Sequence, residues 1–210
     1  MTILFALLVA LSAPVSAVAS TRLGHAVVKE SPALALYREI GLAGQLDTAV
    51  FNAGYRRITQ QGVHGGVIAI ADMTQPSTAK RLYVIDLDTK TLLLRTYVAH
   101  GQNTGDLNAT HFSNALNSHQ SSLGLYRVGA TIASPTHGAA LLLEGLDRTV
   151  NDMARARELI IHGADYVSAA FIAARGRLGR SWGCPAVPRD AMPQMIHSLA
   201  NGGLFYVYGG

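Results

Sequence analysis

The sequence predicts a mainly β domain with peripheral helices, an α+β arrangement built on one core sheet. From residue 66 onward, short runs rich in Val, Ile, Leu and Tyr recur between turn residues, a pattern typical of β-strands. Apolar residues at helical spacing are confined to the first part of the chain and to two short segments near its end. Hydrophobic residues make up 49% of the chain and charged residues 14%, which indicates a folded protein with a real core.

Residues 1–19 have the pattern of a secretory signal peptide. Residues 3–11 are unbroken apolar sequence, and the small residues that follow fit a cleavage site at 15–19. The apolar run is short for a bilayer span, but residues 1–10 contain no Lys or Arg, so an uncleaved anchor is the alternative. A cleaved signal predicts a periplasmic protein of about 190 residues, which suits one domain.

Residues 20–65 are expected to form a helical N-terminal extension packed on a catalytic domain at 66–210, because apolar residues in 31–61 recur near helical spacing. Strands are expected at 67–72, 81–87, 91–99, 121–128, 137–145, 159–163 and 204–208. Helices are expected at 166–174, capped by Asp165, and at 188–201. The polar stretch 100–124 has no periodicity, and loops of that length are often functional.

Charge and histidine spacing limit the classes of partner. The net charge of +4 is modest and the basic residues are scattered, so we expect no nucleic-acid partner. A mild positive balance favours the anionic cell envelope, to which we expect the protein to be peripheral. No H-E-x-x-H motif and no Cys-rich cluster is present, so we expect no metal and no cofactor. A histidine site built from loops stays the alternative, from His100, His111, His119 and His137.

Cys184 is the only cysteine, and it lies in a segment of turn residues, Gly179–Val187. One cysteine in an exported chain cannot form an internal disulfide, which marks the thiol as reactive or as a partner in an intermolecular disulfide; a buried, inert cysteine is the alternative. His162 ends an apolar run 22 residues upstream and precedes Gly163. An imidazolium beside a thiol lowers the thiol pKa, so Cys184 and His162 are candidates for a nucleophile and its base.

The turn around the cysteine offers backbone donors. The N–H groups of Trp182, Gly183 and Cys184 are expected to point into one pocket, as an oxyanion hole requires. Residues 179–183 also match the G-x-S-x-G pattern of serine esterases, but the buried strand and the directly following helix of that pattern are missing. Ser181 is therefore expected to bind substrate or to steady the turn.

Two arginines flank the thiol in sequence. Arg180 and Arg189 would suit a substrate carboxylate through bidentate pairing. The alternative is that they belong to a solvated basic loop.

Together these stretches resemble a known family. Ile161-His162-Gly163, followed by Ser181-x-Gly183-Cys184 on an exported β-rich domain, resembles the catalytic domain of murein L,D-transpeptidases (YkuD-like). The divergent second branch of that family is the nearer likeness, on the stretches 162–168, 179–186 and 100–126. The resemblance runs from about residue 30 to the C-terminus.

The resemblance implies a β-sandwich or barrel and acyl transfer on peptidoglycan stem peptides. Cys184 would attack the carbonyl of an L,D-peptide bond, His162 would be the base, and the Gly163 carbonyl would orient the imidazole. The thioester would pass to an amine of a neighbouring stem, forming a cross-link, or to water. Carbapenem-type inhibitors would react at the same thiol. Substrate contacts are expected from the residues Arg180, Ser181, Arg189, His137, Ser122 and Tyr126.

Two departures from the commoner branch matter. That branch has Ser-His-Gly-Cys, and Trp182 replaces its second histidine, which leaves His162 as the sole base. It also has an arginine shortly after the cysteine, where this chain has Pro185-Ala186-Val187, so Arg180 or Arg189 would take that role. An L,D-peptidase and a non-catalytic envelope-binding module are the other functions considered.

Overall fold

A computed structural model describes residues 30–210, so the expected signal peptide at 1–19 lies outside the described residues. The core is one eight-stranded sheet with the order β3-β2-β1-β8-β4-β5-β6-β7. Its strands are β1 (Val67–Asp72), β2 (Leu82–Asp86), β3 (Thr91–Thr96), β4 (Gly124–Ser134), β5 (Gly138–Gly145), β6 (Ile160–Gly163), β7 (Ala186–Val187) and β8 (Leu204–Tyr208). The helices are α1 (Pro32–Glu39), α2 (Thr48–Gln60), α3 (Ala169–Arg175) and α4 (Met192–Leu199), with the 3-10 turn η1 (Arg189–Ala191) before α4. The predicted mainly β class is confirmed.

The sheet curls until its two edges nearly meet. Beyond the end of β3, Ala99 pairs with Ala186 of β7 through backbone hydrogen bonds of 2.8 and 3.4 Å. Gly101 then forms a further bridge with Ser181. The sheet is therefore a nearly closed barrel, and its closure brings the polar loop after β3 against the turn that carries the cysteine.

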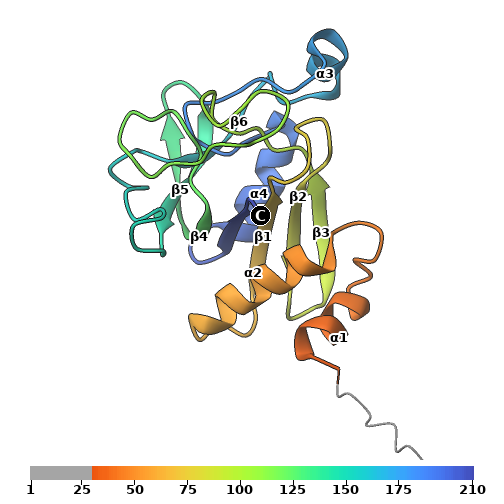
Figure 1. Cartoon of the computed structure of the whole chain (residues 1–210). Coiled ribbons are helices and arrows are strands. Elements are labelled where there is room, and N and C mark those ends of the chain that lie inside the picture. The colour runs from red at the N-terminus through yellow and green to blue at the C-terminus, as the bar shows by residue number, and fades with distance from the viewer. Residues whose placement is uncertain (1–29) are drawn as a thin grey trace, which may run out of the picture.

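Both faces of the central strands are buried, and in β1 the two faces carry side chains of different size. Ile68 and Ile70 of β1 face a core shared with α1 and α2, while Ala69 and Ala71 face a second core shared with α4. Figure 1 shows α2 crossing in front of the strands and α4 behind them. Successive residues of a strand point to opposite faces, so this alternation fixes which helices cover which side.

Most predicted elements form within a few residues of the expected bounds, but three differ. β4 extends to Ser134, so β4 and β5 make a long hairpin with its tip at 135–137. The expected cap by Asp165 is wrong: Ser168 is the N-cap of α3, and its Oγ accepts from the Phe171 N–H at 3.1 Å. The two-residue strand β7 was not predicted, because two residues carry no periodicity.

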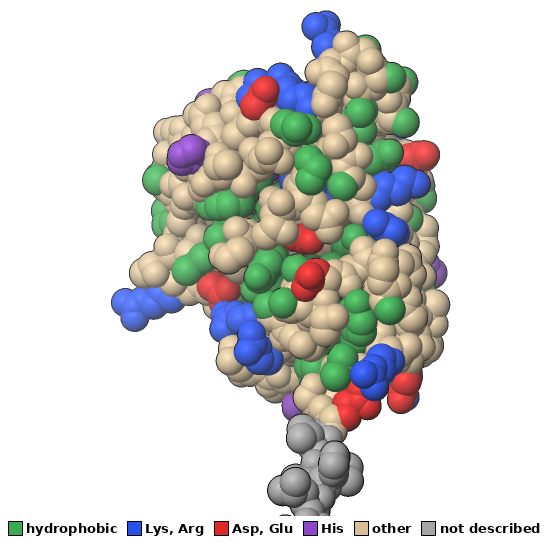
Figure 2. Space-filling model, turned by 45° about the vertical axis from the view of Figure 1, so that its right-hand side comes forward, with side chains coloured by type: hydrophobic (Ala, Val, Ile, Leu, Met, Phe, Trp, Pro, Cys, Tyr) green, Lys and Arg blue, Asp and Glu red, His purple; other side chains and the backbone are tan. Residues whose placement is uncertain are grey.

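Figure 2 shows Lys and Arg side chains beside Asp and Glu on the viewed face, with no broad area of one sign. Within residues 30–210, no helix has the length and apolar character needed to cross a bilayer.

Candidate active site

The barrel places the cysteine turn beside the strand that carries His162. β6 and β7 pair in parallel with His162 opposite Ala186, and the His162 N–H donates to the Pro185 carbonyl at 3.4 Å. Cys184 comes directly before Pro185 and so lies at the entry to β7. The side chains of Cys184 and His162 line one cavity of about 900 Å³.

His162 is buried and its imidazole is neutral near pH 7. Its Nδ1 lies 3.2 Å from the carbonyl oxygen of Gly163. Because a carbonyl only accepts, Nδ1 carries the proton and Nε2 is left as the acceptor. One face of the ring stacks on His137 from the β4–β5 hairpin, with centroids 3.7 Å apart. Burial, reinforced by repulsion from His137 and Arg189, lowers the pKa of His162 to about 4.

The Cys184 thiol is also neutral at rest. Its Sγ lies 4.0 Å from the carbonyl oxygen of Glu158, to which the S–H donates. Burial raises the pKa of the Cys184 thiol, against the opposing effects of the Ile160 N–H and the Arg157 guanidinium. The expected lowering of the thiol pKa by an imidazolium is therefore wrong, because the site desolvates both groups.

Ser181 holds the cysteine turn in shape. Its Oγ donates to the Cys184 carbonyl at 2.5 Å and accepts from the Gly183 N–H at 3.1 Å. Gly183 has φ 122°, and a Cβ at that position would lie 2.8 Å from the Gln120 carbonyl oxygen. Only glycine fits such a position without displacing the loop.

The backbone donors of the turn differ in their availability. The N–H of Gly183 is engaged by Ser181. Within the described part of the chain, the N–H groups of Trp182 and Cys184 meet no oxygen acceptor. The Trp182 side chain is 73% exposed at the rim of the cavity and stacks on His119, with ring centroids 5.1 Å apart.

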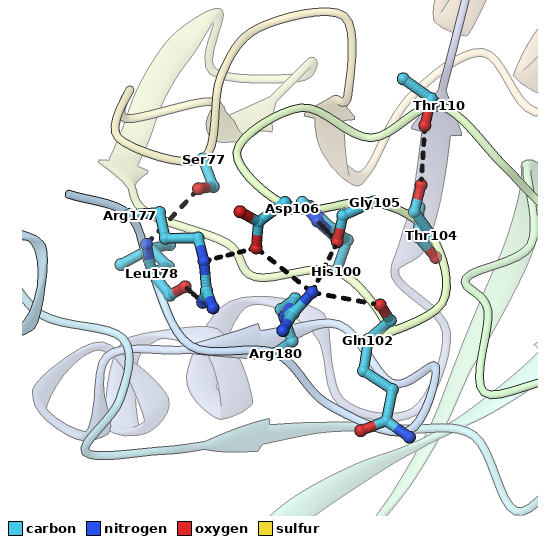
Figure 3. A network of polar contacts seen from close by, with 10 residues as sticks. All are labelled: Ser77, His100, Gln102, Thr104, Gly105, Asp106, Thr110, Arg177, Leu178 and Arg180. Atoms are coloured by element: carbon cyan, nitrogen blue, oxygen red, sulfur yellow. Dashed lines mark hydrogen bonds and ion pairs between the residues drawn. The ribbon is translucent and has the colours of Figure 1, made fainter. Parts of the chain in front are cut away.

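The two candidate arginines have different surroundings. Arg180 lines the cavity; its Nη1 donates to the carbonyls of Gly105 (3.2 Å) and Gln102 (3.4 Å) and lies 3.2 Å from Asp106 Oδ1. Figure 3 shows Arg177 holding the same carboxylate. Arg189 does not line the cavity.

Arg189 forms a bidentate pair with Asp165, at 2.6 and 3.0 Å, on the exposed side of η1. Asp165 does not cap α3 because the helix begins at Ala169, which makes Ser168 the residue at the N-cap position. Gly163 lies against η1, where a Cβ would meet the Cα of Arg189 at 3.1 Å.

Ser122 and Tyr126 lie beside the site and do not line the main cavity. Ser122 Oγ donates to the Ser113 carbonyl at 2.8 Å, and the Tyr126 hydroxyl donates to the Ser122 carbonyl at 2.9 Å. Both side chains are buried. Through these hydrogen bonds, Ser122 and Tyr126 fix the polar loop against β4.

The cavity also contains residues that sequence reasoning missed. Tyr166, Arg155, Arg157 and Glu158 line it. The segment 146–159 that supplies three of them is neither helix nor strand, so no periodic pattern could have marked them. Among residues 30–210, no three His, Cys, Asp or Glu side chains gather into a group that could hold a metal ion.

Comparison with known proteins identifies the family. The family model described as "L,D-transpeptidase catalytic domain" matches residues 43–208. No curated protein matches the chain. Solved structures similar to this chain include an L,D-transpeptidase from Mycobacterium smegmatis (12% identity, TM-score 0.44, covering 69% of this chain and 59% of that one). A second is an L,D-transpeptidase from Mycobacterium tuberculosis H37Rv (15% identity, TM-score 0.41, covering 69% of this chain and 58% of that one). A third is L,D-transpeptidase 3 from Mycobacterium tuberculosis in complex with a faropenem-derived adduct (15% identity, TM-score 0.41, covering 69% of this chain and 61% of that one).

The chain thus spans less than two thirds of the length of these structures. The family assignment rests on the family model, which matches most of the chain and ends two residues before its C-terminus. This chain belongs to the L,D-transpeptidase catalytic domain family.

Proposed function

We propose that this protein is a periplasmic peptidoglycan L,D-transpeptidase in which Cys184 forms a thioester with a stem peptide and transfers it to an amine of a neighbouring stem. The observation that carries the proposal is the cavity that Cys184 and His162 share, at the junction of β6 and β7. Membership of the family supports action on peptidoglycan.

The neutral pair suits a general-base mechanism. As the sulfur attacks the donor carbonyl carbon, His162 Nε2 takes the thiol proton and the carbonyl oxygen becomes an oxyanion. The N–H groups of Trp182 and Cys184 would stabilise that oxyanion, and the Gly183 N–H would join them if it left Ser181. Collapse expels the leaving amine, which takes the proton from His162, and the thioester remains.

The second half repeats these steps with a new nucleophile. An acceptor amine attacks the thioester carbonyl and passes its proton to His162. The new amide forms as the C–S bond breaks, and the proton returns to the sulfur of Cys184. Water in place of the amine would give hydrolysis.

Arg180 is the better candidate for the carboxylate of the stem. It lines the cavity, and Asp106 and two carbonyls hold its guanidinium in place. Guanidinium groups pair with carboxylates in a fixed fork. Arg189 is already paired with Asp165 outside the cavity.

Acylation of the native protein tests the proposal. We expect incubation with a carbapenem to add one inhibitor mass at Cys184, because the β-lactam carbonyl is an electrophile for the cysteine sulfur, and we expect Cys184→Ala to remain folded and unmodified. Mass spectrometry with circular dichroism measures both. A wild-type protein that stays unmodified, or a Cys184→Ala variant that still gains the mass, would refute the assignment.

Product analysis separates transfer from hydrolysis. A stem tetrapeptide is incubated with and without an added amine acceptor, and the products are resolved by mass spectrometry. Cross-linked product that depends on Cys184 is expected when the acceptor is present. Hydrolysis that is unaffected by the acceptor would assign the protein as an L,D-peptidase.

A further inference from the structure

Arg157 brings a positive charge to the cysteine turn. It lies shortly before β6 and lines the same cavity as Cys184. The ion pairs among residues 30–210 involve other cations, and none includes Arg157. Its charge is therefore not cancelled by a bonded carboxylate in the described part of the chain.

Neutral oxygens hold the guanidinium in a fixed place. Nη1 donates to the Ser113 carbonyl at 2.7 Å and to Ser122 Oγ, while Nη2 donates to Ser118 Oγ at 3.2 Å and to the Gln120 carbonyl. All four acceptors belong to the polar loop between β3 and β4. Such bonds orient the fork and leave its net charge intact.

Gly183 lets the guanidinium lie directly against the turn. A Cβ on Gly183 would come within 3.0 Å of Arg157 Nη2, so the absent side chain makes room for the cation one residue from the nucleophile. The positive field of Arg157 acts on the sulfur and lowers the pKa of Cys184, while burial and Glu158 raise it.

Among the described residues that line the cavity, the other groups that could carry a positive charge are neutral, are paired with a carboxylate or, like Arg155, are exposed to solvent. His162 is neutral near pH 7, because its pKa is lowered to about 4. Arg180 lines the cavity but shares its charge with Asp106. Tyr166 also lines the cavity, and burial raises its pKa to about 12, so its hydroxyl is uncharged at neutral pH.

We propose that Arg157 is a positioning residue whose charge stabilises the thiolate of Cys184, while its hydrogen bonds hold the polar loop against the cysteine turn. This rests on the proposed function in taking Cys184 as the nucleophile. In this arrangement the imidazole moves the proton and the guanidinium stabilises the negative sulfur left behind.

Alkylation of the native protein by iodoacetamide, followed from pH 6 to 10, tests this. Arg157→Gln removes the charge, Arg157→Lys keeps it without the fork, and Arg155→Gln removes an exposed arginine of the same cavity as a matched control. We expect Arg157→Gln to slow alkylation at neutral pH by about fivefold or more and to move the pH midpoint upward. Arg157→Lys and Arg155→Gln should stay near the wild-type midpoint.

Two outcomes overturn the proposal: an unmoved midpoint in Arg157→Gln, or a midpoint in Arg157→Lys that moves as far as in Arg157→Gln. The second would mean that the hydrogen bonds and not the charge matter. Should Arg157→Gln fail to fold by circular dichroism, Arg157→Met, which also removes the charge and keeps a long side chain, takes its place, and an unmoved midpoint in that variant overturns the proposal in the same way.

Alkylation reports the sulfur alone and needs no stem peptide. A midpoint that depends on Arg157 in a protein that transfers no stem peptide would uphold this inference and refute the proposed function. A midpoint that does not change on mutation of Arg157, in a protein that does transfer stem peptides, would refute this inference and uphold the proposed function.

Discussion

At the scale of single residues, burial determines the ionisation of the candidate pair. Desolvation raises the pKa of the Cys184 thiol and lowers that of the His162 imidazole to about 4. The stacked His137 ring and the Arg189 guanidinium also disfavour a positive charge on the His162 imidazole. The Gly163 carbonyl holds the proton on Nδ1 and leaves Nε2 free to accept a hydrogen bond or a proton.

This predicts the acid limit of acylation. His162 accepts a proton only when neutral, so single-turnover acylation of Cys184 by a stem peptide should persist down to about pH 4 and be lost as the pH falls through that value. His137→Phe keeps a ring against His162 and removes one repelling charge, so its limit should lie at higher pH. Rates are read by mass spectrometry of quenched samples. An acid limit of wild-type acylation near the ordinary histidine pKa of about 6.5 would contradict the proposal that buried His162 is the base.

At the scale of elements, the turn between α3 and β7 carries Cys184 of the candidate site although the turn has no regular structure. Ser181 closes it from within, and Ser121 Oγ binds the Gly183 carbonyl at 3.1 Å from the polar loop. The loop and the turn therefore form one unit, in which Gly183 is the point of closest approach to Gln120 and Arg157.

A methyl group at Gly183 should break that unit. Gly183→Ala places a side chain at φ 122° and 2.8 Å from the Gln120 carbonyl oxygen, which should cost about 1–3 kcal/mol and reduce acylation at least tenfold. Gly176→Ala at the C-cap of α3 also has positive φ, at 73°, but meets nothing within 4 Å. This control should lose about 1 kcal/mol and keep its acylation rate. Urea unfolding and acylation kinetics measure both, and wild-type acylation by Gly183→Ala would exclude the proposed role.

At the scale of the whole molecule, a buried cation helps to close the barrel. Arg81 is fully buried at the start of β2, and its guanidinium donates to the Val98 and Gln75 carbonyls and, at 2.8 Å, to His100 Nδ1. His100 must be neutral to accept that bond. Burial and the Arg81 charge lower the pKa of His100 to about 4.

The two buried histidines predict how stability changes with pH. The folded pKa of His100 and of His162 is about 4, below the ordinary value of about 6.5 in an unfolded chain. The contribution of the two neutral imidazoles to the free energy of unfolding is therefore complete above about pH 6.5. It is lost as the pH falls toward 4, by about 1.4 kcal/mol per pH unit for each group. Urea unfolding at pH 7, 6 and 5 measures it.

His100→Asn retains an acceptor for Arg81 and should make that pH dependence shallower, whereas His64→Gln on the exposed surface should leave it unchanged. Equal unfolding free energies at pH 7 and pH 5 in the wild-type chain would show that the two imidazoles do not stay neutral in the fold.

The sequence by itself determined the fold class, most of the strands and helices, and the pair Cys184 and His162 as candidates. These features depend on neighbouring residues: period-two runs, helical spacing and the turn residues around one cysteine. The family likeness, carried by motifs of a few residues each, was also readable in the chain and is shown by the family model.

Only the tertiary structure decided what surrounds that pair. The β4–β5 hairpin, whose register shifts between Val128 and Thr131, brings His137 onto His162. Closure of the barrel lays the polar loop and Arg157 against Gly183. The register of strands and the desolvation of a site arise from segments far apart in the chain, and local patterns carry no information about either.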